Sequence, residues 1–475
     1  MRACAAGLAA AGCDVLECGV AMTPTIGVMC DVRGAVGGMV VTASHNPQEW
    51  NGVKVIVGGS AQCSVPSARK AEAAAPSKGL ADEIISRYRA AERSGAAGVG
   101  VERVGSISVS APGGGSALGF VPEAAHIHVD RVREALKAIG CVEDRRWQSI
   151  KCVVDSVNAS GTSGARALLG DRIVHHLGSS ESGIFPHTPE PTRENLVTLA
   201  TFTAQKRADV GFAQDPDADR LAIIDEHGNY IGEEYTLALC VEAVLGAGGS
   251  PALRDGSSAG ASGDSQGPPR RVGVPGGGPP RSVGVPGREP PRSGGPPPAV
   301  CVNLSTSRMI EDVAARYGAR VVRTAVGEAN VVEAMKQEGS LIGGEGNGGV
   351  IWPRVTYIRD SLSSMGLVLA LMTRTGKSVS ELVAEIPSYA IVKRKVDVRG
   401  PEDAKRAVEA VAAAYAGKAG VRVDRRDGVW GGLDERRAWL HVRGSNTEPI
   451  MRLIAEAPSV GEAEGILEEA AGVIG

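Results

Sequence analysis

The chain has 475 residues and a formal net charge of −3, so its charge favours neither nucleic acid nor an anionic membrane as a partner. Apolar residues make up 43% of it, which supports real cores, and the length predicts roughly three or four domains of about 100–150 residues each. Nine cysteines lack paired spacing, and no run of about 20 apolar residues occurs. These features predict a cytoplasmic protein with reduced thiols and no membrane span.

Residues 1–13, MRACAAGLAAAGC, have the basic start and Ala-rich run of a weak signal peptide. The apolar run is short, however, and it leads directly into residues 14–19, DVLECG. We therefore predict the end of a helix closed by Gly12, followed by a strand.

Residues 38–41, GMVV, predict a strand that delivers residues 42–47, TASHNP, into a tight loop closed by Asn-Pro. Ser44 is a candidate nucleophile or phosphate carrier, His45 lies beside it, and Lys54 follows within reach. Because Ser, Asn and Pro are common in turns, a plain strand-ending turn is the alternative.

Further along the chain, apolar runs that predict strands alternate with helical patterns. Residues 151–155 and 300–303 predict strands, residues 307–317 predict a helix, and residues 320–323 predict another strand. This alternation indicates α/β units with mainly parallel sheets.

The most informative motif is residues 215–220, DPDADR, between two apolar runs that predict buried strands. In an extended loop, side chains two apart point the same way, so Asp215, Asp217 and Asp219 can converge on one hard divalent cation. Arg220 adds a fork of donors suited to phosphate. The motif therefore predicts phosphate chemistry assisted by a metal such as Mg²⁺.

Three alternatives compete for this motif. An EF-hand would place Glu226 at its last ligand position, but Arg220 stands where that loop needs glycine, and helices should flank it. A phosphatase resembling haloacid-dehalogenase-type enzymes would use an aspartate as nucleophile, but Asp219 replaces their usual Thr or Val. The third alternative is a solvated acidic turn.

Residues 246–298 differ in composition from the rest of the chain and are dominated by Gly, Pro, Ser and Arg. A unit recurs there, GPPRRVGVPGG from Gly267 and GPPRSVGVPGR from Gly278. Such a segment cannot bury enough apolar surface to offset its chain entropy, so it predicts a disordered spacer between two domains. Its arginines could contact an acidic partner, although the spacer interpretation is favoured. Residues 94–118 predict a weaker connection of the same kind.

Two later loops also carry polar groups suited to a ligand. Residues 343–349, GGEGNGG, lack the Lys-Ser/Thr of a nucleotide-binding loop, but Glu345 and Asn347 could bind sugar hydroxyls. A structural glycine-rich hairpin is the alternative there. Residues 443–449, RGSNTEP, can wrap a phosphate, although an ordinary loop has a similar composition. The candidate phosphate ligands are Arg443, Gly444, Ser445, Asn446, Thr447 and Arg452.

These four loops, in this order, resemble those of the α-D-phosphohexomutase superfamily, which includes phosphoglucomutases, phosphomannomutases and phosphoglucosamine mutases. Residues 185–187 with 189–191 also match, and residues 324–327 resemble a loop that lines the sugar site, through Thr324 and Gly327. The matches span nearly the whole chain apart from the Gly/Pro-rich insertion. Four loops in register are far more specific than any one of them.

The resemblance implies a multi-domain α/β fold around a central cleft, with three related α/β mixed-sheet domains and a smaller C-terminal α+β domain. Each domain would contribute one loop. The expected boundaries are 1–120 (serine loop), 121–245 (metal loop), 246–298 (insertion), 299–387 (sugar loop) and 388–475 (phosphate loop).

The resemblance also implies a mechanism that interconverts a hexose or hexosamine 1-phosphate and 6-phosphate. Ser44 would be phosphorylated, and one Mg²⁺ would be held by the three aspartates and a phosphoserine oxygen. A sugar bisphosphate would serve as intermediate and activator. Arg220 would neutralise charge, and His45 or Lys54 would act as acid or base, a choice that the sequence leaves open. A monomer or homodimer is expected.

The sequence departs from the family pattern in two places. The family normally begins with a strand, a Gly/Thr/Ser/Arg loop and a second strand, whereas this sequence starts at the helix after them. Either the start of the sequence was assigned too late or the first domain is truncated, and a chain as written would have an exposed sheet edge and poor activity. Residues 347–349, Asn-Gly-Gly, stand where many members have Ser-Gly-His, so the choice of sugar stays open.

Two other functions remain as alternatives. One is a metal-dependent phosphatase with Asp215 as nucleophile, and the other is an inactive, mutase-like binding protein.

Overall fold

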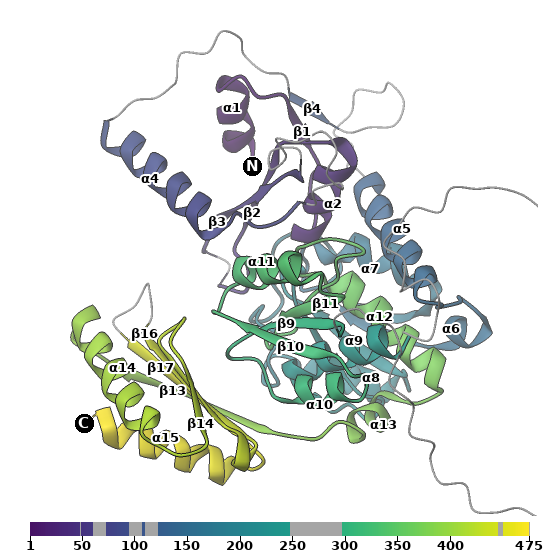
Figure 1. The fold of residues 1–475 in the computed structure, drawn as a ribbon. Helices are drawn as coiled ribbons and strands as arrows, with labels where there is room; N and C mark the ends of the chain where they lie inside the picture. Colours follow the sequence, from purple (N-terminus) through teal and green to yellow (C-terminus); the bar gives the residue numbers. More distant parts are fainter. Residues whose placement is uncertain are drawn as a thin grey trace, which may run out of the picture.

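The computed structural model describes residues 1–47, 49–59, 73–94, 107–109, 122–247, 297–444 and 450–474. The elements group into four units along the chain, coloured from purple to yellow in Figure 1. This is the multi-domain α/β fold predicted from the sequence. The predicted disordered spacer lies outside the described residues except at its two ends, and so does most of the connection over residues 94–118.

The described part of the first unit contains helices and two separate strand pairs. Strand β1 (Val15–Glu17) pairs in parallel with β4 (Ile107–Val109), and β2 (Gly37–Thr42) pairs antiparallel with β3 (Gly52–Val57). No described strand joins the two pairs. The helices are α1 (Arg2–Ala10), α2 (Thr23–Arg33) and α4 (Lys78–Ser94). Gly12, just beyond α1, has the positive φ of 84° that its predicted role at the helix end requires.

The second and third units repeat one sheet pattern. In the second, the strand order is β6-β5-β7-β8, with the first three strands parallel and the last antiparallel. In the third, the order β10-β9-β11-β12 has the same directions. The strands are β5 (Cys152–Asp155), β6 (Ile173–Leu177), β7 (Val210–Gln214), β8 (Leu221–Ile224), β9 (Ala299–Asn303), β10 (Arg320–Thr324), β11 (Ile342–Glu345) and β12 (Gly349–Ile351).

The helices of these two units share one core. It contains buried residues of α5 (Pro122–Ala138), α7 (Gly161–Leu169), α9 (Glu233–Gly246), α10 (Met309–Ala315) and α12 (Ser361–Thr375), together with strand residues of both sheets. α6 (Arg145–Ser149) and α13 (Val379–Ala384) also contribute buried residues to this core, whereas α8 (Val197–Gln205) and α11 (Glu328–Glu338) pack in two smaller clusters. Because the core is continuous, the second and third units hold their loops in a fixed relation to each other.

A buried polar contact brings helices of the first three units together at the start of α12. Asp360 caps α12 by accepting from the backbone N–H groups of Leu362 and Ser363. Its Oδ2 also lies 3.0 Å from Nε2 of His128 in α5, and Nδ1 of His128 lies 2.9 Å from the hydroxyl of Thr25 in α2. This contact fixes the residues just before α12, which reach the candidate site.

The C-terminal unit has its own core. Its five-stranded sheet has the order β13-β17-β16-β15-β14, and α14 (Pro401–Ala416) and α15 (Val460–Ile474) pack on it. Its strands are β13 (Ala390–Asp397), β14 (Val421–Asp424), β15 (Val429–Leu433), β16 (Ala438–Gly444) and β17 (Ile450–Ala457). In Figure 1 this unit stands beside the others, and residues 385–389 lead into it from α13.

Two further expectations concern chain chemistry. The eight described cysteines are all free thiols, as predicted. In the part of the chain that the structure describes, no helix combines the length and the apolar character needed to cross a bilayer.

Candidate active site

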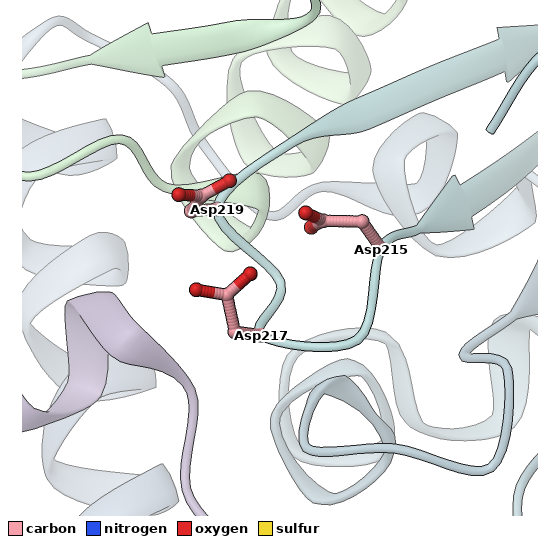
Figure 2. Close-up of side chains that lie close together, drawn as sticks. All are labelled: Asp215, Asp217 and Asp219. Carbon is pink, nitrogen blue, oxygen red and sulfur yellow. The ribbon is translucent and has the colours of Figure 1, made fainter. Parts of the chain in front are cut away.

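The three aspartates of the acidic motif form a buried nest in the turn between β7 and β8 (Figure 2). Asp215, Asp217 and Asp219 each offer one carboxylate oxygen within 4.8 Å of the others. Their side chains are at most 2% exposed. Ala218 between them has a φ of 55°, a conformation uncommon for a non-glycine residue and typical of functional turns. The sequence-based prediction that these carboxylates converge is therefore confirmed.

One oxygen of each carboxylate has a donor. Oδ2 of Asp217 accepts from the Thr23 hydroxyl at 2.6 Å and from Nζ of Lys54 at 2.5 Å. Oδ2 of Asp219 accepts from Lys54 at 2.9 Å and from Arg359 at 2.6 Å. Oδ1 of Asp215 accepts from the backbone N–H of Arg220 at 3.1 Å.

The other oxygen of each carboxylate is buried and has no hydrogen-bond partner. These are Oδ2 of Asp215, Oδ1 of Asp217 and Oδ1 of Asp219. Buried acceptors without donors are rare because leaving one unsatisfied costs about 1–3 kcal/mol. Three such oxygens, one from each ligand, fit a hard divalent cation such as Mg²⁺, which takes oxygen ligands.

The charges in the nest are concentrated and need compensation. Burial, followed by the charges of Asp219 and Asp217, raises the pKa of Asp215 well above its ordinary value. Burial also acts to raise the pKa of Asp219, but the cations Arg359 and Lys54 outweigh it and hold that pKa below its usual range. A bound divalent cation would relieve the remaining repulsion.

Lys54 connects the first unit to the nest. It lies on β3, and its contacts with Asp217 and Asp219 join segments that are 163 and 165 positions apart in the chain. Burial acts to lower the pKa of Lys54, but the charges of Asp219 and Asp217 prevail and raise it. Lys54 is therefore a fixed cation at the nest.

The serine loop connects β2 to β3, so it belongs to the same hairpin as Lys54. Ser44 has a φ of 51°, and its backbone N–H donates to the Thr42 hydroxyl at 2.8 Å. Its hydroxyl lies 3.3 Å from Nδ1 of His45. Burial lowers the pKa of His45, and the charge of Arg220 acts in the same direction.

The predicted sugar loop is the turn between the antiparallel strands β11 and β12. It is therefore a glycine-rich hairpin, and the same hairpin carries the polar side chains of Glu345 and Asn347. Glu345 is 5% exposed, and its Oε1 accepts from Asn303 at 2.8 Å and from the Gly327 N–H at 3.2 Å. Its Oε2 accepts from Arg359 at 2.7 Å. Asn347 is half-buried, and its side-chain oxygen accepts from the Gly349 N–H at 3.2 Å.

The remaining predicted sugar residue has a local partner. Thr324 is 6% exposed, and its hydroxyl donates to the Ala325 carbonyl at 2.9 Å. The sugar loop also contacts the metal hairpin directly, because the Leu221 N–H donates to the Gly348 carbonyl at 3.1 Å. The metal and sugar loops are thus neighbours.

The predicted phosphate loop is only partly described. Arg443 on β16 and Arg452 on β17 are directly opposite each other in the antiparallel pair. This pairing puts two cations side by side, and Nη1 of Arg443 also lies 3.8 Å from Oδ2 of Asp427. Gly444 ends β16 opposite Met451. Ser445, Asn446 and Thr447 lie outside the described residues.

Sequence reasoning missed three residues of this site. Thr23 contacts Asp217 of the metal loop, and Asn303 contacts Glu345 of the sugar loop. Arg359 contacts both loops, through Asp219 and Glu345. The pair Arg359-Asp360 between a hairpin and a helix was the only local signal for any of them.

Comparison with known proteins agrees with this geometry. Four family models described as phosphoglucomutase/phosphomannomutase match in chain order. They are α/β/α domain I over residues 1–80, domain II over 127–228, domain III over 289–389, and the C-terminal domain over 393–473.

A phosphoglucomutase/phosphomannomutase from Thermococcus kodakarensis is 30% identical over 466 residues, covering 97% of this chain and 84% of that protein. The chain belongs to the α-D-phosphohexomutase superfamily. Another phosphohexomutase, a probable phosphoglucosamine mutase from Methanopyrus kandleri, is 28% identical over 468 residues, covering 98% of this chain and 84% of the relative. The names of these two relatives specify different sugars.

Solved structures of phosphohexomutases share the fold. A phosphoglucomutase/phosphomannomutase family protein from Burkholderia thailandensis matches with a TM-score of 0.71 at 21% identity, covering 100% of this chain and 85% of that chain. An N-acetylphosphoglucosamine mutase from Aspergillus fumigatus, solved with GlcNAc-6P and magnesium, matches with a TM-score of 0.52 at 15% identity. That match covers 95% of this chain and 92% of the fungal one.

Proposed function

We propose that this phosphohexomutase interconverts the 1-phosphate and the 6-phosphate of a hexose or hexosamine through a phosphorylated Ser44 and a sugar bisphosphate. The observation that carries the proposal is the nest of three buried carboxylates, each with one oxygen lacking a donor. Lys54, which follows the serine loop in the same hairpin, contacts that nest directly. Superfamily membership supports the class of reaction.

Asp215, Asp217 and Asp219, with a phosphoserine oxygen on Ser44, would hold one Mg²⁺ ion. When bound, the metal supplies positive charge that stabilises the transferring phosphoryl group. The fungal mutase solved with magnesium and GlcNAc-6P supports this choice of ion and of substrate class.

In the proposed step, the oxygen of a sugar hydroxyl attacks the phosphorus on Ser44, and the bond from phosphorus to the serine oxygen breaks. The hydroxyl loses one proton and the serine oxygen regains one, so the protons balance. His45, whose lowered pKa favours the neutral imidazole and whose Nδ1 lies 3.3 Å from the serine oxygen, would accept the proton of the sugar hydroxyl and return it to the serine oxygen. Lys54 is held by two carboxylates and, with Arg220, contributes charge. The bisphosphate then reorients and returns its other phosphate to Ser44.

The sugar ring and its phosphate would be held by the two remaining loops. We assign the ring hydroxyls to the neighbourhood of Thr324, Gly327, Glu345 and Asn347. Three donors already reach Glu345, which leaves about one acceptor position for a hydroxyl. The phosphate is assigned to Arg443, Gly444, Ser445, Asn446, Thr447 and Arg452. A cytoplasmic location and a monomer or homodimer remain predictions.

The proposal is tested by assaying glucose 1-phosphate, mannose 1-phosphate and glucosamine 6-phosphate with Mg²⁺ and a trace of the matching bisphosphate. We expect turnover of at least one sugar, and Ser44→Ala should abolish nearly all of it. Ser149→Ala, which changes an exposed serine in α6, is the control. Failure of the folded wild-type protein on every sugar would favour a binding protein. Phosphate release that survives Ser44→Ala would favour a phosphatase using Asp215.

A further inference from the structure

Arg359 connects the metal loop to the sugar loop through a single buried side chain. Its Nη2 donates to Oδ2 of Asp219 at 2.6 Å, and its Nη1 donates to Oε2 of Glu345 at 2.7 Å. Its Nε lies 3.5 Å from Oε2 of Glu328, at the start of α11. The Arg359 side chain is 9% exposed, so these contacts are shielded from water.

The contacts of Arg359 decide which oxygen each carboxylate presents. At Asp219, the guanidinium and Lys54 occupy Oδ2, and Oδ1 is left without a hydrogen-bond partner. At Glu345, the guanidinium takes Oε2, while Asn303 and the Gly327 N–H take Oε1. Glu345 is therefore fixed in rotation by donors on both of its oxygens, and Asp219 is fixed by two donors on one oxygen.

The shape of the guanidinium ties the two orientations together. It is planar and always charged, and its two terminal nitrogens are rigidly related, so a rotation that releases Asp219 also disturbs Glu345. A lysine at the same position would keep the charge but has one compact ammonium on a flexible stem. It could not reproduce the fork.

Arg359 itself is held by the fold. It immediately precedes Asp360, whose carboxylate caps α12 and contacts His128 of α5. The backbone N–H of Arg359 donates to Oε1 of Glu328 at 2.9 Å. The backbone of Arg359, from which the guanidinium extends, is thus held in place by helices of the second and third units.

We propose that Arg359 is a positioning residue that sets the metal ligand Asp219 and the sugar ligand Glu345 at the same time. The inference rests on the proposed function for its sugar half, whereas its metal half depends only on the geometry of the nest. Partners that orient metal ligands are typically worth about 10- to 100-fold in metal affinity. One substitution at Arg359 should therefore weaken the binding of both the metal and the sugar phosphate.

The test compares Arg359→Lys with the full-length wild-type protein. The affinity for Mn²⁺, a spectroscopic substitute for Mg²⁺, is measured by electron paramagnetic resonance, and the affinity for glucose 6-phosphate by calorimetry. We expect both affinities to fall by roughly 10- to 100-fold. Arg374→Lys is the matched control, because Arg374 lies on α12 and donates to the carbonyls of Ala243 and Glu242, away from both loops. It should leave both affinities unchanged.

A double substitution separates positioning from a general loss of structure. If Arg359 acts on the sugar through Glu345, then Glu345→Gln should weaken sugar binding much less in the Arg359→Lys background than in the wild type. Additive effects would contradict the proposal. If Arg359→Lys does not fold, Arg359→Ala with added guanidinium ion replaces it. Recovery of Mn²⁺ affinity with guanidinium supports positioning, and no recovery overturns it.

The outcomes also separate this inference from the proposed function. Wild-type Mn²⁺ affinity in Arg359→Lys, or a loss of only one of the two affinities, would overturn the role of Arg359 while leaving a mutase possible. If the wild-type protein binds none of the assayed sugar phosphates, the proposed function and the sugar half fail together. The Mn²⁺ measurement still decides the metal half in that case.

Discussion

At the residue scale, the nest depends on which oxygen each aspartate presents. Thr23, Lys54 and Arg359 occupy one oxygen of Asp217 or Asp219, and the other oxygen has no partner. Removing the charge of one aspartate should therefore lower the metal affinity more than it lowers the stability of the fold, since the neighbouring donors stay in place.

We predict that Asp217→Asn lowers the affinity for Mn²⁺ by more than about tenfold. The amide keeps the shape of the side chain but supplies no negative charge, and the donors Thr23 and Lys54 would then face a weaker acceptor. Electron paramagnetic resonance titration measures the affinity. Asp130→Asn, at an exposed position on α5, should have no effect. Equal affinities for Asp217→Asn and the wild type would show that the nest is not a metal site.

The sequence predicted single site residues only where they lie close together along the chain. The alternate aspartates are two positions apart, so the sequence alone could predict that their carboxylates converge. Thr23 and Arg359 reach Asp217 and Asp219 across 194 and 140 positions, and no local pattern reports such contacts. Lys54 was found because it follows the serine loop closely. Its two carboxylate partners, 163 and 165 positions away, could not be read from the sequence.

At the element scale, all four predicted loops connect the strands of antiparallel pairs. The serine loop joins β2 to β3, the metal loop β7 to β8, the sugar loop β11 to β12, and the phosphate segment β16 to β17. Such turns place polar groups at a sheet end. The apolar runs next to the serine and metal motifs predicted β2, β7 and β8. Strands β7 and β8 are fully buried and so read as continuous apolar segments, whereas β2 is only partly buried. The pairing of units two and three around one core was not readable from such runs.

Gly344 shows what the sugar hairpin requires of its sequence. It has a φ of 153°, and a Cβ there would lie 2.2 Å from the Gly349 carbonyl oxygen. We predict that Gly344→Ala lowers the free energy of unfolding by at least about 1–3 kcal/mol and weakens sugar binding. Thermal unfolding and calorimetry measure the two effects.

The matched control is Gly465→Ala on α15, where an added Cβ has no atom within 4 Å. Replacing that helical glycine should stabilise the protein by roughly 0.5–1 kcal/mol. Equal effects of the two substitutions would mean that the hairpin tolerates a side chain at position 344.

At the scale of the whole molecule, the C-terminal unit has a separate core and meets the third unit partly through buried polar groups. Glu456 on β17 is fully buried, and its Oε1 accepts from the Arg308 N–H at 2.8 Å and from Nε1 of Trp439 at 2.9 Å. Burial raises the pKa of Glu456 to about 7. Glu456 therefore makes the stability of this contact depend on pH.

The sign of that dependence follows from proton binding. Because the pKa of a glutamate in an unfolded chain is about 4.3, the folded protein binds this proton more tightly, and Glu456 lowers stability as the pH rises from about 4 to 7. The full cost is on the order of 3 kcal/mol. Glu456→Gln keeps an acceptor oxygen and cannot ionise. We predict a higher thermal midpoint than the wild type at pH ~8 and a smaller difference at pH ~5. The control Glu462→Gln, at an exposed site on α15, should show neither effect. A pH-independent difference would contradict the prediction.

The central claim is that the phosphoryl group is carried by Ser44 beside the aspartate nest. The most direct measurement incubates the protein with Mg²⁺ and a sugar bisphosphate radiolabelled in both phosphates, then locates the label by peptide mass spectrometry. We predict label on Ser44, lost again when an unlabelled sugar monophosphate is added. Label on Asp215 instead, or a folded and metal-bound protein that never acquires label on Ser44, would contradict the account.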